Sequence, residues 1–146
     1  MGSTIIGLER SANLGNTVKL SDNGQILAIG SDDTYDDAGH IDVYKWSGKE
    51  KDWVPYGNRL VGKQAGGEFG WAFDLTPDGR TIVCGSHAYD STAVNNTGLT
   101  EIYTIKLGTW QLKGNQIIGF HQNSTEDDKY YEGLLISMQM ARECKM

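Results

Sequence analysis

Two stretches of the chain repeat one pattern of residues. Residues 14–31 read LGNTVKLSDNGQILAIGS and residues 69–86 read FGWAFDLTPDGRTIVCGS, so that Leu20 falls on Leu75 in a register of 55 residues. Loops of different length then shift the register to 59 residues, with Tyr44 on Tyr103, and to 57 residues, with Trp53 on Trp110. Repeats of this kind are units of secondary structure that bury their apolar faces against neighbouring units. The sequence therefore predicts a modular fold in which adjacent units share a core.

The repeat also defines the domain organisation. Two full units are predicted, at residues 14–62 and 69–119. The motif GNRLVG that closes the first unit resembles GSTIIG at residues 2–7, which predicts that residues 2–7 are the end of a previous unit. Further along, the turn residues of the pattern are missing, so residues 120–146 are predicted to be a degenerate start of a third unit or an irregular tail.

Each unit is expected to contain four short antiparallel strands. Apolar and polar residues alternate in segments enriched in Val, Ile, Tyr and Trp, as is typical of strands. The turns Ser21–Gly24 and Thr76–Gly79 place Asn or Asp before Gly, which supplies a positive φ at little cost. The expected strands are residues 16–20, 25–30, 40–46 and 53–56 in the first unit, and 71–75, 81–85, 99–105 and 110–112 in the second.

A unit of four strands with such a turn and a recurring Trp is typical of a β-propeller blade. The motifs LSDNG at 20–24, AIGS at 28–31 and GHIDVY at 39–44 resemble FG-GAP repeats of integrin-α-like propellers, of the tandem type common in predicted diatom and algal proteins. The resemblance covers residues 2–119. It implies an all-β partial propeller of two four-stranded antiparallel blades with a stub at each end. That family holds calcium between its first two strands, where this chain has only the short turn Ser21–Gly24.

Two blades do not complete a propeller, which closes with about four to eight, so apolar faces are left uncovered. The expected partners are other propeller blades, supplied by a longer parent chain or by a second copy, unless residues 120–146 cap the open face. The resemblance implies a non-enzymatic binding or scaffold module that mediates protein interaction or cell adhesion. The chain is interpreted as a fragment of a larger protein.

The most acidic segment lies between the second and third expected strands of the first unit. Its carboxylates are Asp32, Asp33, Asp36 and Asp37, and carboxylate oxygens are suitable ligands for Ca²⁺. The alternative is a solvated loop that its like charges keep open. The corresponding loop of the second unit contains only Asp90, so a calcium role is not repeated along the chain.

Aromatic residues offer an alternative function. The four tryptophans could stack on sugar rings, and an acidic loop beside a Trp would make a carbohydrate-binding, lectin-like propeller. Trp53 and Trp110 occupy the same repeat position, which favours packing within the blades. No catalytic residues are predicted, because Cys84 takes the place of Ile29 in the other unit and is expected to be a small buried hydrophobe.

Charge and hydropathy exclude two classes of partner. The net charge is −6, whereas nucleic-acid binding requires clustered Lys and Arg. No apolar run reaches the ~18 residues of a membrane span, so no membrane insertion is expected. Asn95 and Asn123 begin N-x-Ser/Thr triplets that are glycosylation acceptors only if the protein is secreted. The compartment is left open.

Overall fold

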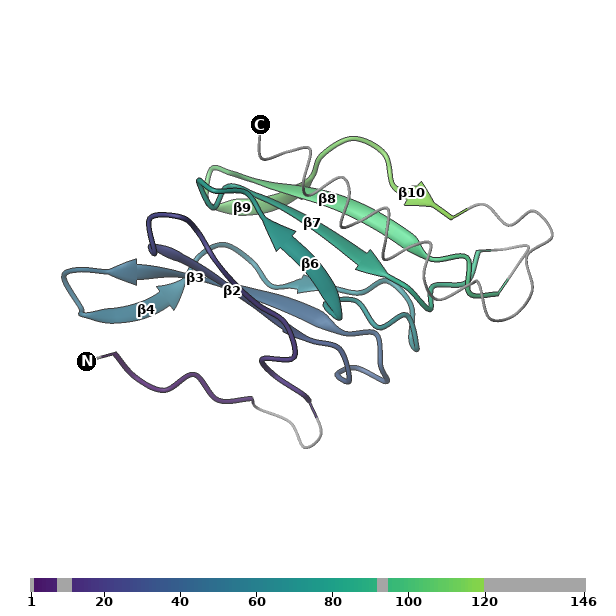
Figure 1. The fold of residues 1–146 in the computed structure, drawn as a ribbon, viewed down its shortest axis with the longest axis horizontal. Coiled ribbons are helices and arrows are strands. Elements are labelled where there is room, and N and C mark those ends of the chain that lie inside the picture. Colours follow the sequence, from purple (N-terminus) through teal and green to yellow (C-terminus); the bar gives the residue numbers. More distant parts are fainter. Residues whose placement is uncertain (1, 8–11, 92–94, 120–146) are drawn as a thin grey trace.

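The computed structural model describes residues 2–7, 12–91 and 95–119. Within these ranges the regular structure is entirely β, with no helix, and the strands form two antiparallel sheets (Figure 1). The fold class expected from the repeat is thus confirmed: the chain forms two adjacent blades of a partial β-propeller, one from each repeat unit.

Blade 1 is built from five strands in four positions. Strand β1 pairs with β2 and β2 with β3, while β4 and β5 lie one after the other along the far edge of β3. The outer edge is therefore a single strand position interrupted between β4 and β5. The strands are β1 (Val18–Leu20), β2 (Ile26–Ser31), β3 (His40–Ser47), β4 (Asp52–Pro55) and β5 (Leu60–Val61).

Blade 2 repeats this order. Strand β6 pairs with β7 and β7 with β8, and β9 and β10 share the outer edge of β8. The strands are β6 (Ala72–Leu75), β7 (Thr81–Ser86), β8 (Leu99–Lys106), β9 (Thr109–Leu112) and β10 (Ile117–Ile118). The eight expected strands match β1–β4 and β6–β9 within two residues at each end. Strands β5 and β10 were not expected, although both lie in the motif that closes each unit.

The first turn of each blade is held by the same hydrogen bonds. In blade 1 the Asn23 side-chain oxygen accepts from the Ser21 hydroxyl at 2.8 Å and from the backbone N–H of Gln25 at 3.0 Å. In blade 2 the carboxylate of Asp78 accepts from the Thr76 hydroxyl at 2.6 Å and from the N–H of Arg80 at 3.0 Å. The repeated sequence thus produces the same local structure twice.

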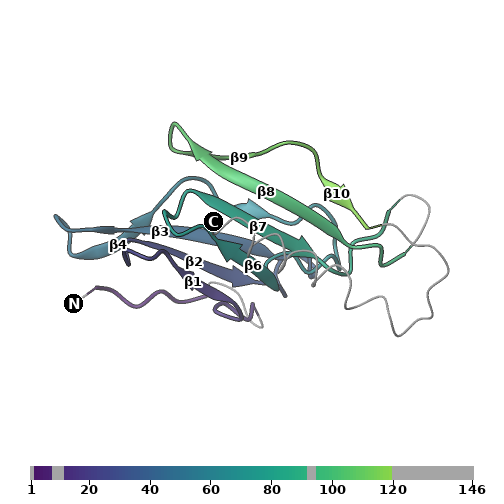
Figure 2. The ribbon, with the colours of Figure 1, turned by 45° about the horizontal axis from the view of Figure 1, so that its top comes forward.

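The main core lies between the two blades, which form neighbouring layers in Figure 2. Strands β1 and β2 contact β6, and apolar side chains of both sheets meet there. Burying them is the principal stabilising contribution in a fold of stacked units. The cluster contains Ile26, Ala28, Ile41, Val43 and Leu60 from blade 1, and Phe69, Phe73, Leu75, Ile82, Cys84, Tyr103, Ile105 and Trp110 from the connector and blade 2.

The connector between the blades passes very close to blade 1. Gly39 and Phe69 form an isolated parallel bridge. A Cβ on Gly39 would lie only 1.9 Å from the carbonyl oxygen of Phe69, and the φ of Gly39 is 77°. Both the space and the backbone conformation therefore require glycine at this position.

Candidate functional site

The two blades expose the same sheet face to different surroundings. We define the leading face of blade 2 as the side of its sheet that packs against blade 1. The leading face of blade 1 is the equivalent side of its own sheet. On blade 2, Phe73 and Leu75 are 5% and 6% exposed because blade 1 covers them. Their counterparts on blade 1, Val18 and Leu20, are 51% and 55% exposed. The leading face of blade 1 is therefore open where that of blade 2 is covered.

Residues 2–7, the N-terminal segment, run alongside this open face (Figure 1). Ser3 donates two hydrogen bonds to Asp52, from its N–H at 2.7 Å and its hydroxyl at 2.6 Å. These bonds lower the pKa of Asp52. A Cβ at Gly2 would lie 3.2 Å from Trp46, and one at Gly57 would lie 2.9 Å from Ile105, the counterpart of Trp46. Gly2 therefore lies against blade 1 as Gly57 lies against blade 2.

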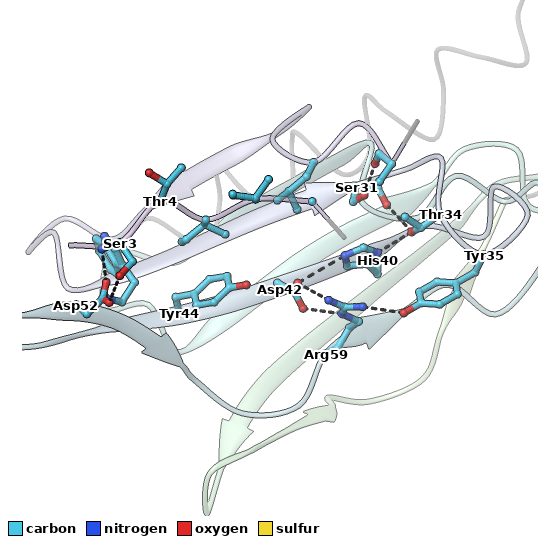
Figure 3. Close-up of a pocket in the computed structure, with 16 residues that line it drawn as sticks. Ser3, Thr4, Ser31, Thr34, Tyr35, His40, Asp42, Tyr44, Asp52 and Arg59 are labelled. Carbon is cyan, nitrogen blue, oxygen red and sulfur yellow. Dashed lines mark hydrogen bonds and ion pairs between the residues drawn. The ribbon is translucent and has the colours of Figure 1, made fainter. Parts of the chain in front are cut away.

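A cavity of about 420 Å³ lies between the N-terminal segment and the leading face of blade 1 (Figure 3). Its wall mixes apolar side chains of the N-terminal segment with polar and aromatic side chains of the blade. The residues that line it are Ser3, Thr4, Ile5, Ile6, Gly7, Ala12, Leu14, Ser31, Thr34, Tyr35, His40, Asp42, Tyr44, Asp52, Trp53 and Arg59.

A carboxylate at the centre of this wall is held by two neighbours. Arg59 donates from Nε to Oδ1 and from Nη2 to Oδ2 of Asp42, each at 2.8 Å, in the bidentate geometry that makes such pairs strong. His40 Nε2 lies 3.6 Å from Asp42 Oδ2. Burial disfavours the charged carboxylate, but the hydrogen bonds and charges of His40 and Arg59 outweigh it and lower the pKa of Asp42 to about 2. Asp42 is therefore ionised at neutral pH.

The ionised carboxylate affects the groups around it. Its hydrogen bonds raise the pKa of Arg59 further above its usual value. Burial, followed by the charge of Asp42, raises the pKa of Tyr44. Both side chains thus stay protonated. Arg59 can only donate hydrogen bonds, whereas the Tyr44 hydroxyl can both donate and accept them. The Asp42–Arg59 ion pair is thus the centre of a hydrogen-bonded network in the cavity wall.

The loop between β2 and β3 supplies two more side chains to the cavity wall. Thr34 Oγ1 lies 2.6 Å from His40 Nδ1, and Arg59 Nη1 donates to the Tyr35 hydroxyl at 2.7 Å. Residues Tyr35, Asp36 and Asp37 all have positive φ, at 57°, 56° and 60°. Consecutive left-handed residues other than glycine are uncommon and need support from their surroundings.

That support comes from the connector between the blades. The backbone carbonyl of Asp36 accepts from the N–H of Gly66 at 2.9 Å, and that of Asp37 accepts from the N–H of Glu68 at 2.8 Å. These two bonds hold the loop against the connector, while the Tyr35 side chain points toward Arg59 (Figure 3). The loop part of the cavity wall is therefore held by backbone hydrogen bonds to the connector.

The chain of Thr34, His40 and Asp42 contains the residue types of a nucleophile, a base and a carboxylate. Its geometry does not suit that chemistry. Thr34 is 2% exposed and its hydroxyl also lies 3.3 Å from the carbonyl oxygen of Ser31, whereas a nucleophile must reach its substrate. The arrangement orients the imidazole and is suited to binding.

The four aspartates of the acidic loop lie in different surroundings, and calcium binding by them stays a prediction. Asp32 is 2% exposed and its Oδ1 has no hydrogen-bond partner, whereas Asp36 and Asp37 are exposed. Burial and then the charges of Asp32 and Asp37 raise the pKa of Asp33, which contacts Asn13. Across the described ranges, no group of three or more His, Cys, Asp or Glu side chains is placed to hold a metal ion. The loop instead contributes Thr34 and Tyr35 to the cavity.

Of the other described residues named from the sequence, Trp53 lines the cavity, whereas Asn95, Cys84 and Trp110 do not. Asn95 is exposed in a turn, and Asn123 lies outside the described residues. Cys84 is fully buried, as expected, and burial raises its thiol pKa well above the usual value. Trp110 is buried and its indole donates to the carbonyl of Tyr56 at 2.8 Å. Trp53 is half-buried in the cavity wall.

Sequence reasoning did not assign a role to Tyr35, His40, Asp42 or Arg59. A signal was present in the repeat alignment. His40 stands where blade 2 has Leu99, and Arg59 stands where blade 2 has Gln116. Positions at which two copies of a repeat differ in polarity are candidates for a site specific to one copy.

Comparisons with protein-family models and with curated proteins find no significant match to the chain. Among the described residues, no helix has the length and apolar character needed to cross a membrane.

Proposed function

We propose that the chain is a non-enzymatic binding module that receives a further propeller blade on the leading face of blade 1. The observation that carries this proposal is the contrast between equivalent positions. Val18 and Leu20 are more than half exposed, whereas blade 1 buries Phe73 and Leu75 of blade 2 almost completely. Exposed apolar residues at positions that elsewhere form the core mark an interaction surface.

The interface between blades 1 and 2 provides a template for the partner. Blade 1 presents small and branched apolar side chains to blade 2, namely Ile26, Ala28, Ile41 and Val43. Beside them Lys19 Nζ lies 3.5 Å from Asp74 Oδ1, and Asp74 is the counterpart of Lys19. A blade that docks on blade 1 would therefore present an acidic residue to Lys19 and a similar apolar surface.

The N-terminal segment supplies one part of that missing blade. In blade 1, β5 pairs with β3 through Leu60 and Val61, which correspond to Ile5 and Ile6 in the N-terminal segment. Ile6 is 73% exposed, and the described structure places residues 2–7 in no strand. The partner is accordingly a segment of the same repeat type that lacks only the last piece of its outer edge, and its third strand pairs with Ile5 and Ile6.

Such a module would act as a scaffold, joining blades into a larger propeller that presents its loops to a protein ligand. The resemblance to FG-GAP and integrin-α-like repeats supports a role in protein interaction or cell adhesion. The docking face itself is supported by the packing of the two blades.

An extended chain tests this proposal. A copy of residues 69–113 is placed before Gly2, so that residues 2–7 take the position that residues 114–119 hold in blade 2. Val18→Cys in a Cys144→Ser background reports access to the face through thiol labelling, with the modified peptide identified by mass spectrometry. Docking of the added blade is expected to slow labelling at position 18 by more than about tenfold, because burial limits labelling to transient opening.

The matched control carries Asp74→Lys only in the added copy, which places a lysine opposite Lys19. This variant is expected to label faster than the parent extended chain, since like charges in contact are destabilising. Labelling as fast as in the original chain, with circular dichroism showing that the added strands have folded, would contradict the docking face.

A further inference from the structure

The cavity wall has a chemistry that the interface between the blades does not share. At equivalent positions blade 2 has the apolar Leu99 and the neutral Gln116, whereas blade 1 has His40 and Arg59. We propose that the cavity binds a neutral polyhydroxylated ring, such as a sugar residue, between the N-terminal segment and the leading face of blade 1. Its volume of about 420 Å³ lies within the usual range of small-molecule sites, roughly 300–1,000 Å³.

The charges of the wall favour a neutral ligand. The guanidinium of Arg59 is neutralised by the bidentate carboxylate of Asp42, so an anion would gain little from it. Asp52 contributes a second carboxylate to the lining, and its negative charge would oppose an anion. An apolar ligand would have to remove water from these charged groups without replacing its hydrogen bonds, which is costly.

The remaining hydrogen-bonding capacity matches hydroxyl groups. Arg59 has five N–H groups, of which two bind Asp42 and one binds Tyr35. Two N–H groups therefore remain for an acceptor. The Tyr35 hydroxyl accepts from Arg59 and keeps its own hydrogen to donate. Because a hydroxyl group both donates and accepts, adjacent hydroxyls of a ring can bind such an edge.

Aromatic side chains around this edge suit the C–H faces of a ring. Tyr35, Tyr44 and Trp53 line the same cavity as the Asp42–Arg59 pair. Figure 3 shows Tyr35 and Tyr44 reaching toward that pair from different parts of the blade. Aromatic rings combine a large apolar face with a polar edge. A ligand with hydroxyl groups at its rim and C–H groups on its faces meets both requirements.

The wall is held in place before a ligand binds. Thr34 orients His40, Arg59 is bound to both Asp42 and Tyr35, and the connector fixes the left-handed loop from behind. Binding to a preformed site loses less conformational entropy than binding to a site that must be ordered. The cavity lies on the face that a further blade would cover, so this inference concerns the chain with that face open, and it depends on Tyr35 and Arg59 and not on Val18 or Leu20.

The test uses the full chain and a panel of methyl glycosides of glucose, galactose, mannose and N-acetylglucosamine. Saturation-transfer NMR identifies a binder and isothermal titration measures its affinity. We expect at least one glycoside to bind saturably. Tyr35→Ala and Arg59→Lys are each expected to weaken it by at least about tenfold, the equivalent of one good hydrogen-bonded or stacked contact. Arg59→Lys retains the charge and loses the planar fork.

Trp71→Ala is the matched control, because Trp71 is 46% exposed and does not line the cavity. It is expected to leave the affinity unchanged. Near-UV circular dichroism verifies that all variants retain the native fold. The inference is overturned if no glycoside of the panel binds, or if the affinity depends on Trp71 and is unaffected by Tyr35→Ala and Arg59→Lys in folded protein.

Discussion

Blades 1 and 2 have the same strand order and the same first turn, yet their leading faces lie in different surroundings. Blade 2 buries Phe73 and Leu75 against blade 1, and blade 1 leaves Val18 and Leu20 in contact with solvent. At the position that Phe73 fills in blade 2, blade 1 has the smaller and exposed Val18. The difference shows that strand pairing within a blade and packing between blades are separate contributions, and only the second depends on a neighbour.

The buried carboxylates of the two blades extend this comparison. In blade 2 Glu101 is 1% exposed and its Oε1 contacts Lys63 at 2.8 Å and Gln116 at 2.7 Å, while its Oε2 has no hydrogen-bond partner. In blade 1 the equivalent Asp42 has both oxygens bound by Arg59. A carboxylate at this position therefore joins β3 or β8 to the outer edge in both blades, and in blade 1 it lines a cavity.

The largest expected effect separates the two leading faces. Phe73→Ala should lower the free energy of unfolding by about 3–5 kcal/mol, because it leaves a cavity between the blades. Val18→Ala should change it by no more than about 0.5 kcal/mol, since this side chain is already half in water. Urea unfolding followed by tryptophan fluorescence measures both. Equal losses for the two variants would show that the blade 1 face is buried in solution.

Val18→Ala can also be measured in the chain that is extended by a copy of residues 69–113. Once an added blade covers the leading face, Val18→Ala should cost more than about 1 kcal/mol, because a buried side chain is then truncated. An unchanged small effect in that background would argue against docking.

A pH-dependent effect follows from the Asp42 network. The pKa of Asp42 is lowered to about 2 from an ordinary value of 3.8, so its ionised form stabilises the fold. This contribution is fully present above pH 4 and is lost as the pH falls from 3.8 to about 2. By linkage it amounts to roughly 2 kcal/mol.

Asp42→Asn should remove this contribution. Urea unfolding at pH 5 and at pH 2 is expected to show a stability difference that is smaller in the variant than in the parent by roughly 2 kcal/mol. Asp22→Asn, which alters an exposed carboxylate outside the network, serves as the control and should leave that difference unchanged. If Asp42→Asn behaves like the control, the Arg59 pair contributes nothing to stability in solution.

Local structure was predictable from the sequence because it depends on local chemistry. The turn at Asn23 and Gly24 and the continuous apolar runs of β2 and β7 require only residues close in the chain. Strands β5 and β10 were missed because two-residue strands carry no periodicity, and they are identified only by their pairing with β3 and β8.

The cavity was missed for a related reason. Tyr35, His40 and Arg59 are separated in sequence and are brought together by a left-handed loop and by an interrupted outer edge. The four aspartates are close in sequence, yet Asp32 is buried while the other three are exposed, a difference that the spacing of residues in a loop does not indicate.

The smallest effects are expected where the two blades agree. Asn23→Ala removes an acceptor for two hydrogen bonds in the blade 1 turn, and Asp78→Ala removes its counterpart in blade 2. Each should cost about 1 kcal/mol, because these turns are partly open to water, which replaces part of the lost bonding. Similar losses in urea unfolding would show that turn formation is independent of packing between blades. A loss for Asp78→Ala several times that for Asn23→Ala would mean instead that blade 1, whose Asp22 N–H donates to the carbonyl of Pro77 at 3.0 Å, relies on the blade 2 turn for its own position.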